Sequence, residues 1–140
     1  NEETAKRDAL LTPIEKNIDQ GETDNQRGLT AKNLTQLKAA FEGAAARFKQ
    51  AIAQCDTASK QTKEPDLLQA MSDMSKTATN GAVQAYLNLA NAYSSRGNYV
   101  KGTEYCNMAL AVDPNNAEAK AARATISTTT SGWNKRRGRR

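Results

Sequence analysis

Apolar residues recur at helical spacing in two successive stripes between residues 83 and 116. Tyr86, Leu89 and Tyr93 lie three and four residues apart, which places them on one face of a helix. Gly97 and Asn98 interrupt this pattern, and a second stripe follows through Tyr99, Tyr105, Cys106, Ala109, Leu110 and Val112. Two helices of similar length joined by so short a turn must pack antiparallel, so the pattern predicts an αα-hairpin.

The residues of this segment resemble those of the tetratricopeptide repeat (TPR) family, whose units are about 34 residues long. Those that fit the family pattern are Leu89, Tyr93, Tyr99, Ala109 and Pro114. Tyr86 stands where the family usually has Trp, and Ala90 replaces a frequent Gly with another small residue. Gly102 stands where the family prefers Ala, and Cys106 replaces a large aromatic residue. The resemblance implies stacked helical hairpins that bind proteins and do not catalyse a reaction.

The segments on either side match the family less well. Residues 117–127 begin like a further first helix, but the polar Lys120 and Arg123 suggest a helix that caps the stack. Upstream, Ala44, Phe48 and Ala51 have the spacing of a second TPR helix. The sequence leaves open whether this is a degenerate repeat or a long amphipathic helix, and we slightly prefer the helix.

The remaining pattern predicts three more helices. We expect a helix over residues 1–20 with a break near Leu11 because Pro13 lies inside it, and a loop over the polar, glycine-bracketed residues 21–28. Further helices are expected over residues 31–59 and, from Pro65, to a stop at residues 79–81. The predicted fold is all-α, with about six helices in antiparallel hairpins stacked as a short TPR-like α-solenoid. Its domains are an N-terminal helix and loop (1–29), a TPR-like helical domain (30–128) and a Ser/Thr linker with a basic tail (129–140).

Charge is concentrated at the C-terminal end. The chain carries 20 Lys and Arg against 15 Asp and Glu, a net charge of +5. The last eight residues contain five cations, so the rest of the chain is neutral. A tail of this kind attracts phosphates or an acidic protein surface, and Trp133 is suited to stacking on a base or filling a pocket of a neighbour. The predicted tail contacts are Trp133, Lys135, Arg136, Arg137, Arg139 and Arg140.

The sequence contains little that bears on compartment. Cys55 and Cys106 are most simply two buried thiols, with a disulfide between them as the alternative. Asn33 begins an Asn-Leu-Thr glycosylation triplet of a type that is frequent by chance. The chain begins at Asn1 and shows no signal peptide or membrane span, which fits a processed chain or a fragment. We slightly favour an exported or extracellular protein over a cytoplasmic one.

Catalytic and cofactor-binding patterns are missing from the sequence. There is no His, and two widely spaced Cys do not form a zinc site. No glycine-rich phosphate loop or nucleophile motif is present. We therefore predict a non-enzymatic protein without a metal or cofactor.

The TPR resemblance implies a binding groove lined by the first helix of the hairpin. Transferred position by position, that face carries Gln84, Leu87, Asn88, Asn91, Ser94 and Ser95. Leu87 stands where relatives that clamp a peptide carboxylate have Lys, so this specificity is not expected. A neutral, solvated face is the alternative interpretation.

Two functions are compatible with these features. The first is a self-assembling structural or scaffolding subunit, such as one of an extracellular filament, whose termini contact neighbouring copies. The second is a soluble adaptor whose tail binds nucleic acid or an acidic partner while the repeat recruits proteins. We favour the first, because the neutral body offers no further basic surface to a nucleic acid.

Overall fold

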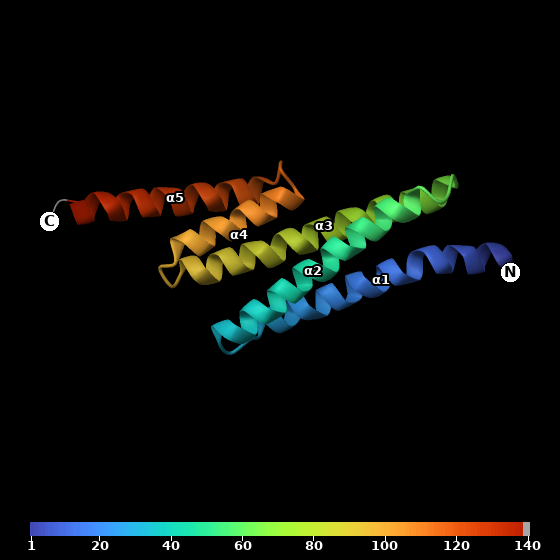
Figure 1. The fold of residues 1–140 in the computed structure, drawn as a ribbon, viewed down its shortest axis with the longest axis horizontal. Coiled ribbons are helices and arrows are strands. Elements are labelled where there is room, and N and C mark those ends of the chain that lie inside the picture. Colours follow the sequence, from blue (N-terminus) through green and yellow to red (C-terminus); the bar gives the residue numbers. More distant parts are fainter. Residues whose placement is uncertain (139–140) are drawn as a thin grey trace. The chain divides into compact units, whose positions relative to one another are not determined.

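Five α-helices make up the computed structural model, which describes the backbone of residues 1–138 and the side chains of residues 1–130 (Figure 1). In chain order they are α1 (Glu2–Leu29), α2 (Leu34–Ser59), α3 (Pro65–Ser94), α4 (Tyr99–Val112) and α5 (Ala117–Gly138). The described residues contain no strand. The predicted all-α class is confirmed, and within each unit helices that are adjacent in sequence pack against each other as antiparallel hairpins. Five helices replace the predicted six because the helix expected from Pro65 and the first helix of the hairpin form one continuous helix, α3.

The chain divides into two compact units, Asn1–Ala82 and Val83–Arg140, with the boundary inside α3. In the first unit α1 packs along α2. The largest fully buried side chains of this unit are Ile14, Phe41, Phe48 and Met71. In the second unit α4 packs along α5, and Val83, Leu89 and Cys106 are fully buried. Each unit therefore has its own apolar core.

Helix α1 continues through Pro13, where the sequence pattern predicted a break. Proline removes one hydrogen bond of the helix and crowds the preceding turn. Leu11, Ile14 and Ile18 are nevertheless buried on both sides of it. The apolar contacts of these side chains offset the cost of the proline.

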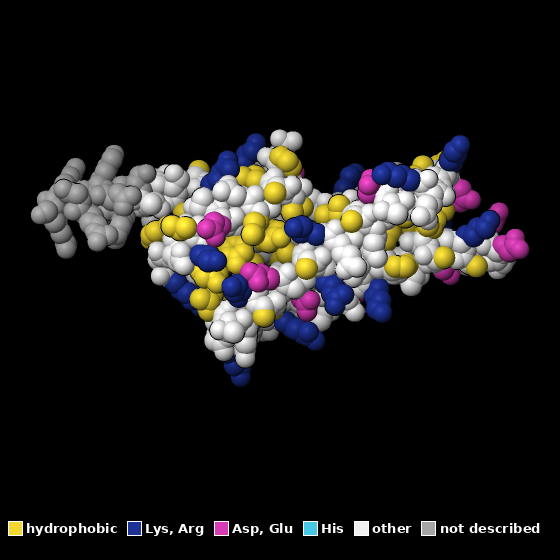
Figure 2. Space-filling view, in the orientation of Figure 1, with side chains coloured by type: hydrophobic (Ala, Val, Ile, Leu, Met, Phe, Trp, Pro, Cys, Tyr) yellow, Lys and Arg dark blue, Asp and Glu magenta, His cyan; other side chains and the backbone are white. Residues whose placement is uncertain are grey.

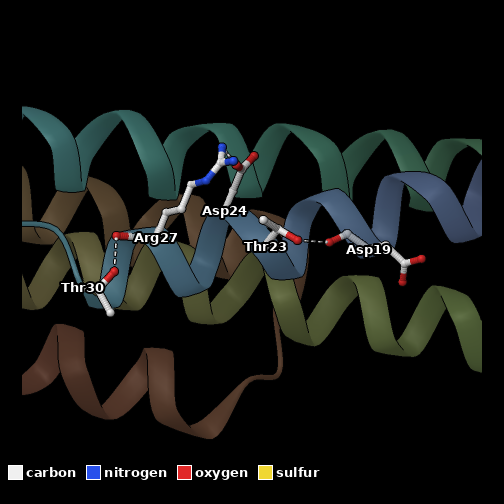
Figure 3. A network of polar contacts seen from close by, with 5 residues as sticks. All are labelled: Asp19, Thr23, Asp24, Arg27 and Thr30. Atoms are coloured by element: carbon white, nitrogen blue, oxygen red, sulfur yellow. Dashed lines mark hydrogen bonds and ion pairs between the residues drawn. The ribbon is translucent and has the colours of Figure 1, made fainter.

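The loop predicted over residues 21–28 is also wrong, because this segment is helical. Figure 3 shows its polar side chains bonded along the helix: the Thr23 hydroxyl donates to the Asp19 carbonyl, and Arg27 pairs with Asp24 at 3.4 Å. The two glycines that suggested a loop face aromatic rings. A Cβ at Gly28 would lie 2.6 Å from the ring of Phe41, so this glycine permits close helix packing.

Phe48 joins the three helices of the first unit. Its ring lies 2.9 Å from the position of a Cβ at Gly21 in α1 and 2.5 Å from that at Gly81 in α3. The Asn25 side-chain amide also donates to the Gly81 carbonyl, at 3.3 Å. Gly81 is thus a packing position inside a continuous helix and does not end a helix as predicted.

The second unit contains the hairpin predicted from residues 83–116. Gly97 has φ +83°, the left-handed conformation that glycine adopts without strain. The Asn98 side chain then caps α4 by accepting from the Lys101 amide at 3.1 Å. Tyr105 stacks against both Tyr86 and Tyr93, with ring centroids 6.4 and 5.6 Å apart. The turn and the aromatic stack hold α3 and α4 together as an antiparallel pair.

Helix α5 begins at a cap and extends past its predicted end. The Asn116 side chain accepts from the Ala119 amide at 2.9 Å. The helix was expected to end at residue 127 and give way to a Ser/Thr linker, but it continues to Gly138. Hydroxyls of Thr128, Thr129 and Thr130 donate to carbonyls four residues earlier, so this polar run is accommodated within the helix.

Candidate protein-binding groove

A hollow of about 390 Å³ lies in the second unit between α3 and α5. Most of its wall comes from these two helices, and Tyr99 at the start of α4 contributes to it as well. Its lining residues are Leu87, Ala90, Asn91, Ser94, Ser95, Tyr99, Ala122, Thr125, Ile126 and Thr129. We refer to this hollow as the groove.

The two walls are related by the length of one repeat. The Gln84 side chain donates to the Glu118 carboxylate at 2.8 Å, across a sequence separation of 34 residues. The same separation relates Asn91 to Thr125, and both of these line the groove. Helix α5 therefore follows α3 at the length of one repeat, and residues 34 apart lie on opposite walls of the groove.

The chemical character of the lining is mixed but uncharged. Leu87, Tyr99 and Ile126 provide apolar surface. The side-chain amide of Asn91 is exposed and has no hydrogen-bond partner among the described residues. The Ser95 hydroxyl donates to the Ala92 carbonyl at 3.1 Å. The groove thus offers hydrophobic contact together with one free amide that can both donate and accept.

Ser94 differs from the other hydroxyl-bearing residues of the groove. Its Oγ is buried and has no hydrogen-bond partner among the described residues. A Cβ placed on Gly102 would collide with this oxygen and would lie 3.3 Å from the Ala90 carbonyl. Glycine at position 102, where the TPR pattern has alanine, therefore provides room for the Ser94 side chain.

The structure brings four of the six groove residues expected from the sequence to this hollow. Leu87, Asn91, Ser94 and Ser95 line it. Gln84 is bonded to Glu118 beyond the lining residues, and Asn88 is half-buried outside the lining. The α5 wall was not predicted, because the polar Lys120 and Arg123 give residues 117–127 the pattern of a capping helix. The 34-residue spacing between Asn91 and Thr125 is the sequence signal from which this wall could have been predicted.

The predicted tail contacts lie outside the side chains that the structure describes. This applies to Trp133, Lys135, Arg136, Arg137, Arg139 and Arg140. Over the part that is described, charges of both signs are interspersed on the face shown in Figure 2. The binding role of the six tail residues stays a prediction from the sequence.

Both cysteines are buried free thiols in the structure, Cys55 in the first unit and Cys106 in the second. Burial raises the pKa of Cys55. Burial also raises the pKa of Cys106, an effect that the guanidinium of Arg123 partly opposes. Both shifts disfavour the thiolate, which is the reactive form.

We expect the two thiols of the native chain to react with DTNB at least about tenfold more slowly than those of the chain unfolded in guanidinium. Their burial and raised pKa values both act in this direction. The rate of absorbance change reports the reaction, and rapid labelling of the native chain would contradict the expectation. The sequence also allowed a disulfide between Cys55 and Cys106. In that case the unfolded chain, kept free of reductant, would give no absorbance change with DTNB, because no free thiol would be present.

Within residues 1–130, no three His, Cys, Asp or Glu side chains are grouped so that they could hold a metal ion. None of the helices, as far as they are described, has the length and hydropathy to cross a membrane.

The family model of the tetratricopeptide repeat matches residues 83–116. The resemblance read from the sequence is therefore confirmed over that segment, which is the α3–α4 hairpin. Searches of curated proteins and of solved structures found no match to the chain. A repeat of this family supports a general role in protein–protein interaction, and such repeats are typically non-catalytic.

Proposed function

We propose that the protein is a non-enzymatic scaffold that binds a segment of another protein chain in the groove between α3 and α5. The observation that carries this proposal is the groove itself, in which equivalent positions of two successive first helices face the same hollow. Its volume of about 390 Å³ lies within the range of ligand pockets, roughly 300–1,000 Å³.

Selection from a random peptide library displayed on phage, with the full chain as bait, tests this proposal. We expect peptides that bind the wild-type chain and lose at least about tenfold in affinity for Asn91→Trp, because the indole fills the groove. Asn91 is exposed, so this change leaves the core intact. The control is Ala121→Trp, on an exposed position of α5 outside the groove lining. Equal binding to wild type and Asn91→Trp, or no selected peptide, would reject the proposal.

We further propose that copies of the chain assemble through α5, as expected of a structural subunit. Ala117, Ala121, Ala124 and Thr128 are exposed and share one face of this helix at intervals of three and four residues. Small side chains allow another helix to approach closely. A face of this kind supports stacking of a second copy, and head-to-tail stacking generates rings or filaments.

Light scattering across a range of concentrations tests this assembly. For the wild-type chain we expect a mass that exceeds that of the monomer and rises with concentration. In Ala121→Trp the mass should fall towards that of the monomer, because the bulky side chain blocks the close approach of another helix. Here Asn91→Trp is the control, so each variant serves as reference for the other. A concentration-independent monomer would contradict self-assembly and leave groove binding unaffected.

Removal of residues 133–140 separates the scaffold from the adaptor alternative. The segment carries five cations, so an adaptor that uses it should lose affinity for RNA, DNA or an acidic protein when it is deleted. If the tail instead contacts neighbouring copies, the deletion lowers the assembled mass in the light-scattering measurement. The same truncated chain therefore answers both questions.

A further inference from the structure

We infer that the groove takes an extended, uncharged segment of its partner and discriminates against acidic segments. This inference rests on the proposed function of the groove and adds the chemistry of the ligand. It comes from the distribution of charge around the lining, together with the one free amide inside it.

None of the ten lining side chains is charged, although charged residues make up 25% of the chain. Arg96 lies next to Ser95 in sequence but does not line the groove, and its guanidinium donates to the Ala92 carbonyl at 2.7 Å. A carboxylate brought into the groove would therefore lose part of its hydration without gaining a cation among the described residues. An unpaired charge that is partly removed from water in this way is disfavoured.

The negative charge of Glu118 at one end of the groove also disfavours acidic segments. Glu118 lies one helical turn before Ala122, which lines the groove, and its carboxylate accepts from Gln84. No ion pair to Glu118 occurs within the described residues. Its negative charge repels acidic residues of a partner, and a basic residue is tolerated at this end.

The remaining groups suit the backbone and small apolar side chains of an extended chain. The free amide of Asn91 can donate to a carbonyl and accept from an N–H of the segment. Leu87, Tyr99 and Ile126 provide apolar surface beside it. Main-chain hydrogen bonding with side-chain contacts alongside is a recurring mode of peptide recognition.

Synthetic versions of a peptide selected on the full chain test the inference. In each, one uncharged residue is replaced in turn by Glu or by Lys, and affinities are measured by fluorescence anisotropy. We expect Glu at a groove-facing position to weaken binding by at least about tenfold relative to the parent peptide. This ratio should shrink in Asn91→Lys, which removes the amide for both peptides but supplies a cation only the Glu peptide can use. The matched control is Asn80→Lys, on an exposed position of α3 that does not line the groove.

Three results would overturn the inference. Acidic residues enriched among the selected peptides, a Glu scan without effect on affinity, or equal rescue by Asn80→Lys each contradict it, while the groove stays a binding site. If no peptide is selected at all, or Asn91→Trp leaves binding unchanged, the proposed function fails together with the inference. The two failures are thus distinguishable.

Discussion

Replacing Phe48 by alanine is expected to lower the free energy of unfolding by about 3–5 kcal/mol. The ring is 1% exposed and is contacted from two sides by helices that carry glycine at the point of approach. Neither Gly21 nor Gly81 has a side chain that can move into the space, so the cavity left by the ring stays open. Because folded domains are stable by only about 5–15 kcal/mol, a loss of this size removes a large part of the total.

Guanidinium denaturation followed by circular dichroism measures this loss. Leu29→Ala is a suitable control, because the Leu29 side chain is 61% exposed and its removal should cost less than about 0.5 kcal/mol. A decrease below about 1 kcal/mol for Phe48→Ala would show that the three helices of the first unit do not depend on this ring.

Replacing Gly81 by alanine is expected to destabilise the protein by about 1–2 kcal/mol, although alanine is the better helix former. Alanine gains about 1 kcal/mol of helix propensity inside α3. Its Cβ, however, would lie 2.5 Å from the Phe48 ring, which cannot withdraw because Gly21 of α1 lies on another side. Overpacking of this kind costs about 1–3 kcal/mol, and we place this site at the upper end because the clash is with a buried ring.

Gly43→Ala is the matched control for this effect. Gly43 lies inside α2, and its nearest neighbour is the Asp24 carboxylate, 3.3 Å from the added Cβ. That side chain is partly exposed and can shift, so the change should stabilise the protein by about 0.5–1 kcal/mol. Thermal or chemical unfolding should show changes in the free energy of unfolding of opposite sign for Gly81→Ala and Gly43→Ala. Stabilisation by both would contradict the role assigned to Gly81.

The sequence predicted the helical class and the hairpin of residues 83–116 because both depend on local signals. Tyr86, Leu89 and Tyr93 show the helical period directly, and Gly97 marks the turn. The same signals failed where contacts between distant helices decide the outcome. Gly21 and Gly81 suggested chain breaks, but each is a contact point for Phe48, and sequence spacing does not reveal that ring.

Four of the ten residues that line the groove were predicted, because a single hairpin is enough to place them. Leu87 and Asn91 follow from the position of the first helix in a single repeat. Thr125 and Ile126 were missed because Lys120 and Arg123 made the following helix resemble a solvated cap. In the structure these two cations occupy exposed positions, and Arg123 donates to Asn107 of α4 at 3.0 Å. The helix has a polar exposed face and still supplies a wall of the groove.

Segment binding in the groove is tested most directly by nuclear magnetic resonance of the isotope-labelled full chain titrated with a selected peptide. We predict the largest amide chemical-shift changes at residues 87–95, at the end of α3 and directly after it, and at residues 122–129 of α5. Both sets of changes should disappear in Asn91→Trp. Changes confined to α1 and α2, or identical changes in Asn91→Trp, would contradict the assignment of the groove as the binding site.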